Sequence, residues 1–382
     1  MEAYRRNAPM YVDEEAERAT RWDAFLAQKR DDNGNDDDDD ARDGARTLDA
    51  LVRVLDARAA RGSGDDASEE SDEERELRAL VAGGVPMALR GRCWQIFARV
   101  KERRRDGVFR ELLVAAGESA SAEVLETKDR KEDGDENGDE EDAVERVLAS
   151  LVDATCTAVP DDGSRTAVRD DASDSTPCTA VSPDTSFRRV RKQIDKDLPR
   201  TFPGHPLLDG IGRDALRRVL CAYALHNPAV GYCQGMNFLA ALLLLLMEEE
   251  PAFWCLSALV EDVLPGYYGN TMLASAVDQA VLRTFVDSRF PRVGAALDDA
   301  GVPLAAVAGS WFLTLYVNHL PWEVALRVWD VLLFERTRRV LFQTALALKL
   351  RRPFIVPSTP ATVSSAWWDA YRDIISVHVT SA

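Results

Sequence analysis

Apolar residues recur at helical spacing through most of residues 188–350, and no other feature of the sequence constrains the fold as much. The segments with an apolar helix face are 216–223, 238–247, 253–260, 281–285 and 324–334. Residues 238–247 are apolar on every side and are expected to form a buried rod, while Val281, Leu282 and Phe285 are expected to face the core together. Because no convincing alternation of period two occurs in this region, the sequence predicts an all-α domain.

Outside this region, helical patterns alternate with acidic, Gly-rich and Ser-rich stretches. An amphipathic helix at 11–29 is expected from Trp22, Phe25 and Leu26. A helix ending at Gly83-Gly84 and another over 87–100 are expected to begin the folded body. The predicted organisation is an N-terminal amphipathic helix (1–30), an acidic linker with one short helix (31–74), a folded domain (75–350) interrupted by a disordered acidic insertion (about 117–186), and an atypical tail (351–382).

The negative charge of the chain is concentrated rather than spread evenly. The formal net charge is −18, and the acidic residues gather in runs such as Asp36–Asp40 and Lys131–Asp142. Such runs repel themselves and stay solvated. A pI near 4.8 argues against nucleic acid or anionic lipid as the main ligand, because both require a positive face.

Several other classes of protein are disfavoured by what the sequence lacks. No apolar run follows the N-terminus, and the longest apolar stretch, Phe238–Met247, is about half the length of a membrane-spanning helix. The six cysteines include no C-x-x-C pair and the four histidines lie far apart, so no metal site or disulfide framework is visible. No Gly-rich phosphate loop occurs. A soluble, cytoplasmic protein without a cofactor of its own is therefore expected.

The segment Gln193–Pro203 is one of two that stand out from core-building sequence. Pro199 and Pro203 bracket Arg200, so the backbone there is stiff and presents a long cation from a turn. Asp197, three residues earlier, can reach back and orient the guanidinium. An arginine beside an aspartate is also a common surface ion pair, so the spacing alone does not establish a site.

The segment Asn227–Asn237 is the second. Its turn contains two glycines and presents Tyr232 and Gln234 directly before the apolar rod. Glycines allow the backbone to approach a partner surface closely. A glutamine near a helix start is also often a cap or simply solvated.

Phosphoryl transfer explains why an arginine and a glutamine would be needed together. A GTPase must neutralise charge on the γ-phosphoryl oxygens and hold a water in line for attack; an arginine serves the first need and a glutamine amide the second. An arginine supplied in trans is worth roughly 10³–10⁵ in rate. Lysine is a poor substitute because it lacks the planar, forked donors.

Taken together, the motifs resemble the TBC domain family of Rab GTPase activators. The resemblance covers about 77–350 without the insertion. Its segments are, in the family's order, Gly84-Val85-Pro86, Arg90-Gly91-Arg92 with Trp94, Ile194 with Asp197, Arg200 and Thr201, Tyr232 with Gln234, Gly235 and Met236, Leu264–Tyr268, Asp278-Gln279, Ser310–Leu313 and Leu320–Asp330. The N-terminal Glu14–Arg18 with Arg21-Trp22 also resembles the lead-in of plant-type members.

The resemblance implies an all-helical TBC fold that supplies two side chains in trans. Arg200 would stabilise charge on the γ-phosphoryl group, and Gln234 would position the water. The supporting residues it implies are Asp197, Tyr232, Ile194, Thr201 and Gly235. Trp94, Trp311 and Trp329 are interpreted as core, Arg90 and Asp330 as buried polar residues that hold the fold, and Arg327 is left open.

The resemblance implies an activator rather than an enzyme, with a Rab-type GTPase in its GTP form as partner. GTP and Mg would be carried by that partner. Membrane contact would be made only through the lipidated GTPase. The process in which the protein would act is vesicle trafficking and intracellular protein transport. The sequence gives no oligomeric state.

Two other functions remain open at this stage. One is a catalytically silent scaffold of the same fold that binds a GTPase or effector. The reason for keeping this scaffold hypothesis is the tail, where Pro353 and Pro357 prevent the helices expected after Leu350. The other is an acidic chaperone acting through the Asp/Glu runs.

Overall fold

A computed structural model describes residues 2–31, 48–61, 70–118, 183–269 and 271–350. Within these ranges the regular structure is entirely helical, with no strand, which confirms the all-α prediction. The disordered insertion expected at about 117–186 falls almost wholly on residues outside the described ranges, as do most of the acidic linker and the tail at 351–382.

The N-terminal part contributes six helices among the described residues. They are α1 (Glu2–Asp31), α3 (Asp49–Arg61), α4 (Asp72–Gly83), α5 (Met87–Phe97), α6 (Val100–Arg103) and α7 (Val108–Ala115). The Ser71 hydroxyl caps α4 by accepting a 3.2 Å bond from the Glu74 amide, and Gly84, at φ +102°, ends the helix as predicted. The single helix expected over 87–100 is instead broken, because Arg99 adopts a left-handed conformation (φ +54°).

The C-terminal part follows as a dense series of helices joined by short turns. They are α10 (Pro183–Asp197), a 3₁₀ turn η2 (Leu198–Arg200), α11 (Ile211–His226), α12 (Met236–Leu244), α13 (Glu249–Ala258), a π-helical turn η3 (Leu259–Val263), α14 (Leu273–Arg289), α15 (Pro291–Asp299), α16 (Leu304–Leu313), α17 (Trp322–Glu335) and α18 (Arg339–Leu350). The predicted rod at 238–247 corresponds to α12, which is buried along most of its length.

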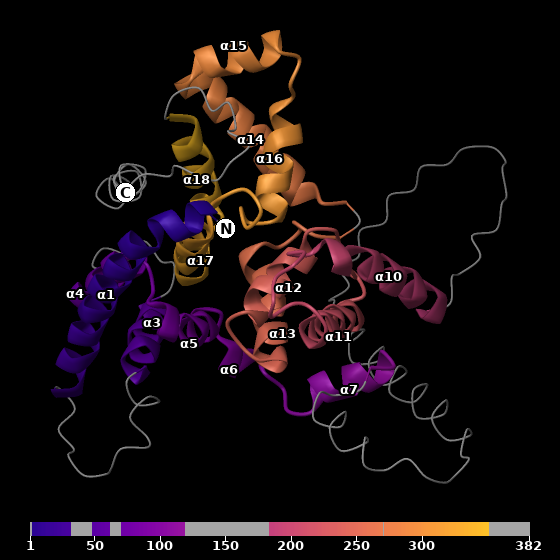
Figure 1. Ribbon diagram of the computed structural model, residues 1–382, viewed down its shortest axis with the longest axis horizontal. Helices are drawn as coiled ribbons and strands as arrows, with labels where there is room; N and C mark the ends of the chain where they lie inside the picture. The colour runs from indigo at the N-terminus through magenta and orange to yellow at the C-terminus, as the bar shows by residue number, and fades with distance from the viewer. Residues whose placement is uncertain (1, 32–47, 62–69, 119–182, 270, 351–382) are drawn as a thin grey trace, which may run out of the picture.

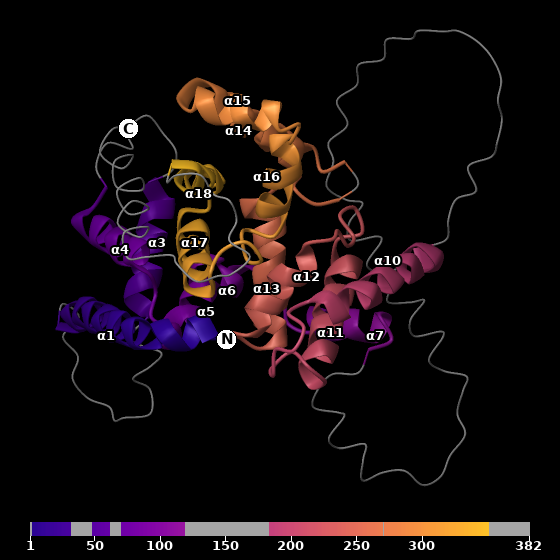
Figure 2. The same ribbon diagram turned by 45° about the horizontal axis from the view of Figure 1, so that its top comes forward.

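The described helices gather around α12 and α13 (Figure 1). Helix α11 packs against α12, α13, α10 and α7, so the segment before the insertion and the segment after it lie on one side. On the other side α17 packs against α4 and α5, and α3 packs against α4. Helices α14, α15 and α16 extend away from this body (Figure 2). The two segments singled out in the sequence therefore lie where α10, α11 and α12 meet.

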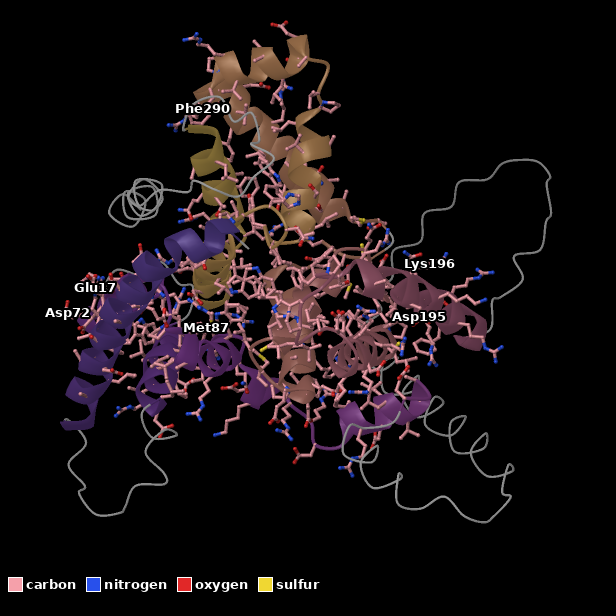
Figure 3. The ribbon with its side chains drawn as sticks, in the orientation of Figure 1. Glu17, Asp72, Met87, Asp195, Lys196 and Phe290 are labelled. Carbon is pink, nitrogen blue, oxygen red and sulfur yellow. The ribbon has the colours of Figure 1, made fainter. Side chains whose placement is uncertain are left out.

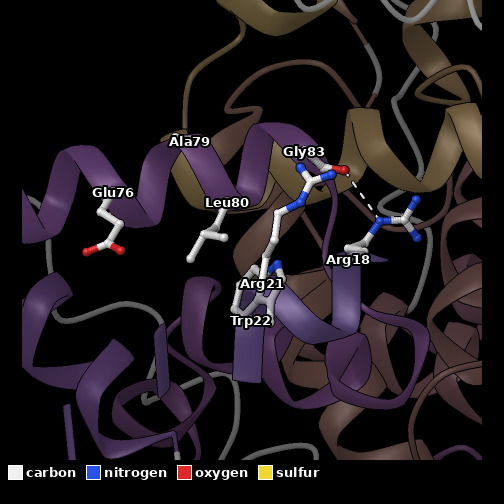
Figure 4. A pocket seen from close by; sticks show the side chains of 7 residues that line it. All are labelled: Arg18, Arg21, Trp22, Glu76, Ala79, Leu80 and Gly83. Carbon is white, nitrogen blue, oxygen red and sulfur yellow. Dashed lines mark hydrogen bonds between the residues drawn. The ribbon is translucent and has the colours of Figure 1, made fainter. Parts of the chain in front are cut away.

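Helix α1 is longer than the 11–29 expected and is packed onto the domain rather than separate from it. Trp22, fully buried, donates a 3.0 Å hydrogen bond to the Gly84 carbonyl. Arg18 lies beside the Gly83 carbonyl, at the edge of a small pocket between α1 and α4 (Figure 4). Arg327, which the sequence left open, is buried and pairs with Glu14 at 2.8 Å.

Burial raises the cost of a charge at Arg327, and its pKa is correspondingly lowered to about 10. The Arg18 guanidinium lowers it further, while the Glu14 carboxylate opposes both effects. Arg327 thus acts in the packing of α1 on α17 and lies outside the candidate site.

Asp330 is the polar centre of the core between α5 and α17. Its side chain is fully buried and accepts bonds from Arg90 Nε (3.0 Å) and Nη2 (3.1 Å), from the Trp94 indole (2.7 Å) and from the Val85 amide (2.8 Å). Trp94 in turn stacks on Trp329, with ring centroids 5.3 Å apart. Arg90 and Asp330 are thus buried structural residues, and Trp94 and Trp329 belong to the core. Trp311 is only partly buried at the edge of that core, so its assignment as a core residue holds in part.

The expected apolar face of α14 is wrong in two of its three residues. Leu282 is buried together with Val286, but Val281 and Phe285 are exposed. The helix turns Ser275, Asp278, Leu282 and Val286 inward, and α16 packs alongside. The sequence did not predict this orientation because apolar residues occur on both sides of the helix.

Candidate functional site

Arg200 lies at the end of a sharply terminated helix, as the two prolines predicted. Helix α10 gives way at Asp197 to the 3₁₀ turn η2, which contains Pro199, and Thr201 is already extended. Phe202 then takes a left-handed conformation (φ +43°), which directs the chain away from the helix axis. The turn is consequently fixed in its backbone on both sides of Arg200.

Aromatic packing holds this turn on the body of the domain. The Phe202 ring packs edge-on against Phe238 of α12, at 5.7 Å between centroids, and against Trp322 of α17, at 6.3 Å. Ile194, one turn before Asp197, is fully buried. Ile194 therefore acts here as a core anchor for the end of α10.

Gln234 lies in the turn between α11 and α12, directly before the buried rod. Gly231 and Gly235 both adopt positive φ (+61° and +110°). A Cβ on Gly235 would lie 3.0 Å from the Leu313 carbonyl oxygen, so the turn passes close to the end of α16. This close approach requires glycine at position 235.

Two hydrogen bonds tie the turns of Arg200 and Gln234 to each other. The Tyr232 hydroxyl donates to Asp197 Oδ2 at 2.7 Å, and the Asn237 amide donates to Thr201 Oγ1 at 2.7 Å. The structure thus brings together two segments that lie more than thirty residues apart in the sequence.

Asp197 is the residue through which the two turns are joined. Its side chain is 1% exposed and forms an ion pair with the Arg200 guanidinium, while Gln193 Nε2 lies 3.4 Å from Oδ2. The Asp197 carbonyl also accepts a 2.8 Å bond from the Thr201 hydroxyl. A buried carboxylate that is balanced by one arginine holds that arginine in a defined orientation.

Arg200 and Gln234 both remain exposed in this arrangement. The Arg200 side chain is 58% exposed despite its ion pair, and Gln234 is exposed. Asp195 and Lys196, on the preceding turn of α10, are also exposed (Figure 3). Both side chains are thus accessible at the surface of the domain.

The chemistry of Tyr232 is that of a hydrogen-bond donor. Burial raises the pKa of its hydroxyl well above the usual value, Cys233 adds to this, and the nearby Arg200 charge opposes it. The hydroxyl therefore stays protonated at neutral pH and remains available as a donor to Asp197.

Asn237 is a residue of this site that the sequence analysis did not single out. It is buried, accepts a 3.1 Å bond from the Gly235 amide on Oδ1 and donates to Thr201. Its signal in the sequence was a single amide at the start of an otherwise apolar helix. A buried amide in such a position needs partners on both of its polar atoms.

The described residues contain no group of three or more His, Cys, Asp or Glu side chains arranged to hold a metal ion. Among the helices described, none combines the length and the apolar character needed to cross a membrane.

Comparison with known proteins places the site within a family. A family model described as the Rab-GTPase-TBC domain matches residues 172–355. TBC1 domain family member 2A of Rattus norvegicus is 46% identical over 162 residues, which are 41% of this chain and 17% of that protein. Growth hormone-regulated TBC protein 1 of Rattus norvegicus is 43% identical over 176 residues, 44% of this chain and 60% of that protein. The chain thus spans less than two thirds of the length of these relatives.

Two solved structures are also similar. The crystal structure of the Chlamydomonas flagellar RabGAP TBC domain aligns with a TM-score of 0.48 and 25% identity over 85% of this chain and 89% of that one. The YPT/RAB-GAP domain of Gyp1p aligns with a TM-score of 0.43 and 17% identity, over 85% and 88% of the two chains. By the match to the family model and the identity to these relatives, residues 172–355 are similar to the TBC domain family. The candidate site lies within this matched segment.

Proposed function

We propose that this protein accelerates GTP hydrolysis on a Rab-type small GTPase by inserting Arg200 and Gln234 into the nucleotide pocket of that partner. The observation that carries the proposal is the pairing of the two turns through Asp197 and Tyr232, with both functional side chains left exposed. The chain would act as an activator that completes an active site in trans and would itself hold no nucleotide.

The two side chains divide the work. Arg200 offers planar, forked donors to the charge that develops on the γ-phosphoryl oxygens. Gln234 offers an amide that can accept from and donate to the attacking water. GTP and Mg are carried by the partner in its GTP form.

The remaining residues of the site position these two. Asp197 orients the guanidinium, Tyr232 fixes Asp197, and Thr201 joins the two turns through Asn237. Gly235 lets the glutamine turn approach α16. Prepositioned donors save the reorganisation that flexible ones would require during the reaction.

Such an activator would work in the cytoplasm and reach endomembranes through its lipid-anchored partner. This role belongs to vesicle trafficking and intracellular protein transport.

The test is single-turnover GTP hydrolysis across a panel of Rab proteins, with the full chain and its Arg200→Ala variant. Loss of Arg200 should lower the accelerated rate by roughly 10³–10⁵-fold, and Arg200→Lys should recover little of it. Gln234→Ala should lower the rate by about 10²-fold or more.

Arg213→Ala is the matched control. Arg213 forms a 2.7 Å pair with Asp209, so the variant also removes a partly exposed arginine from an aspartate partner. It should leave the rate unchanged. If the unsubstituted chain and Arg200→Ala both bind a GTPase and neither raises its rate of GTP hydrolysis, the protein is instead a scaffold that recognises a GTPase without turnover.

A further inference from the structure

The outer face of α14 is apolar over most of its length. Leu273, Val277, Val281 and Phe285 recur every four residues and are 64%, 50%, 38% and 42% exposed. Exposed residues that lie between them are Ala276, Ala280 and Thr284. These seven residues form a continuous stripe, named here the outer stripe of α14.

No charged side chain interrupts this stripe. Asp278 is buried and is bound by the Tyr267 hydroxyl and, at 3.2 Å, by Arg338. Arg283 pairs with Asp287 at 2.8 Å and with Asp298 at 2.7 Å. A helix face meant for water normally carries charged residues, and a contiguous exposed apolar face marks an interface.

The opposite face of α14 already has its partner, since α16 packs alongside it. The outer stripe is therefore a second apolar face, and among the described residues Phe342 of α18 packs against its Phe285 end. Small alanine side chains alternate with larger ones along the stripe, a pattern that suits bulky residues from a facing segment.

The sequence after the described residues contains a matching apolar pattern that the proposed function does not use. Trp367, Ala370, Tyr371, Ile374 and Ile375 fall on one side of a helical projection. The polar residues of the same stretch fall on the other side of that projection: Asp369, Arg372, Asp373 and Ser376. Such a pattern has one face to bury and one to leave in water.

The chain leaves the described structure close to the outer stripe. Phe342 of α18 packs edge-on against Phe285 at 6.1 Å, and α18 ends at Leu350. The 17 residues of α14 span about 25 Å at 1.5 Å per residue. The residues between Leu350 and Trp367 can span roughly 50 Å when extended. Every point of the stripe is thus within reach.

We propose that the segment Trp367–Ile375 covers the outer stripe of α14 within the same molecule. The large side chains of the segment match a stripe that alternates small and large residues, and most of the stripe is exposed in the described structure. The contact would bury apolar surface that both elements otherwise expose to water.

Collisional quenching of tryptophan fluorescence by iodide in the full chain tests this contact. Trp22, Trp94, Trp254 and Trp329 are shielded within the domain, so quenching reports chiefly the more accessible indoles. Val281→Asp should expose Trp367 and Trp368 and increase quenching. Ala295→Asp, an equal charge at an exposed position of α15, should leave quenching unchanged.

Thermal unfolding supplies a second and independent measurement. Ile374→Ser should lower Tm by roughly 2–4 °C for each kcal/mol of lost contact, whereas Arg372→Ser on the polar side should not. Val281→Asp combined with Ile374→Ser should lower Tm by less than the sum of the two single changes, because both remove one contact.

Three outcomes would overturn the proposal. One is that Val281→Asp combined with Ile374→Ser lowers Tm by the full sum of the two single changes. Another is a quenching difference that appears only at concentrations where the chain dimerises, which would assign the segment to a second copy. The third is loss of GTPase binding by Val281→Asp with no change in quenching, which would make the GTPase the occupant. None of these depends on Arg200, so the outcome is separate from the test of GTP hydrolysis.

Discussion

The hydroxyl of Tyr232 donates a 2.7 Å hydrogen bond to Oδ2 of Asp197, the same buried carboxylate that pairs with Arg200. One side chain from the glutamine turn thereby fixes the residue that orients the arginine. The turns that carry Arg200 and Gln234 are coupled through a single carboxylate, so a substitution in one turn should alter the geometry of the other.

Tyr232→Phe should therefore weaken GTP hydrolysis while leaving the fold intact. The variant keeps the ring and removes one donor to a buried carboxylate, a loss of about 1–3 kcal/mol. If half or more of that loss reaches the transition state, the rate falls roughly 2–150-fold. The measurement is single-turnover hydrolysis beside Tm; an unchanged rate together with a lowered Tm would restrict Tyr232 to a structural role.

Gly235→Ala should be clearly more damaging than Gly204→Ala. Both glycines adopt positive φ, +110° and +78°, but a Cβ at 235 meets the Leu313 carbonyl at 3.0 Å while a Cβ at 204 has nothing within 4 Å. Gly204→Ala should cost about 1–2 kcal/mol from its backbone alone. Urea denaturation of the two variants, compared with the parent chain, measures the difference, and equal midpoints would contradict the close approach.

Asp330→Ala should destabilise the protein by about 3–5 kcal/mol, because it leaves the buried Arg90 guanidinium without its counter-charge. The Trp94 indole and the Val85 amide would lose their acceptor as well. Asp298→Ala, which breaks the surface pair with Arg283, is the control and should not move the unfolding midpoint. Similar midpoints for both variants would show that the buried cluster contributes little.

Stability should fall as the pH drops below about 6.5. Burial lowers the pKa of His226, against an opposing effect of Glu261, and burial likewise lowers the pKa of His319. Near and below pH 6.5 the two histidines therefore bind more protons in the unfolded chain than in the folded protein. Each histidine can then lower the free energy of unfolding by up to about 1.4 kcal/mol for each pH unit of acidification. Denaturation of the parent chain and of His226→Phe between pH 7.5 and 5.5 measures this, and the variant should show the shallower loss.

Much of the fold could be predicted from the sequence because its information is local. Helical spacing of apolar residues indicated the elements, glycines and prolines marked their ends, and Pro199 and Pro203 placed Arg200 on a turn. The break before α6 carried no such mark, since neither Ala98 nor Arg99 is a helix breaker.

The contacts between distant segments could not be predicted in the same way. The hydrogen bonds of Tyr232 to Asp197 and of Asn237 to Thr201 join positions 35 and 36 residues apart. No local sequence pattern predicts such contacts. The predicted orientation of α14 was wrong for a related reason. Apolar residues lie on two sides of this helix, and their spacing does not show which side packs against the core. The catalytic roles of Arg200 and Gln234 stay predictions until hydrolysis is measured.

The cluster around Asp330 bears on how the protein can be shortened for the bench. Asp330 falls within the matched range 172–355, yet Val85, Arg90 and Trp94 come from outside it, as does Glu14, the partner of Arg327. A fragment cut to the matched range would lose the three donors to the buried Asp330 carboxylate and the Glu14 carboxylate that pairs with Arg327. A truncated version fit for binding or crystallisation work must therefore retain α1, α4 and α5.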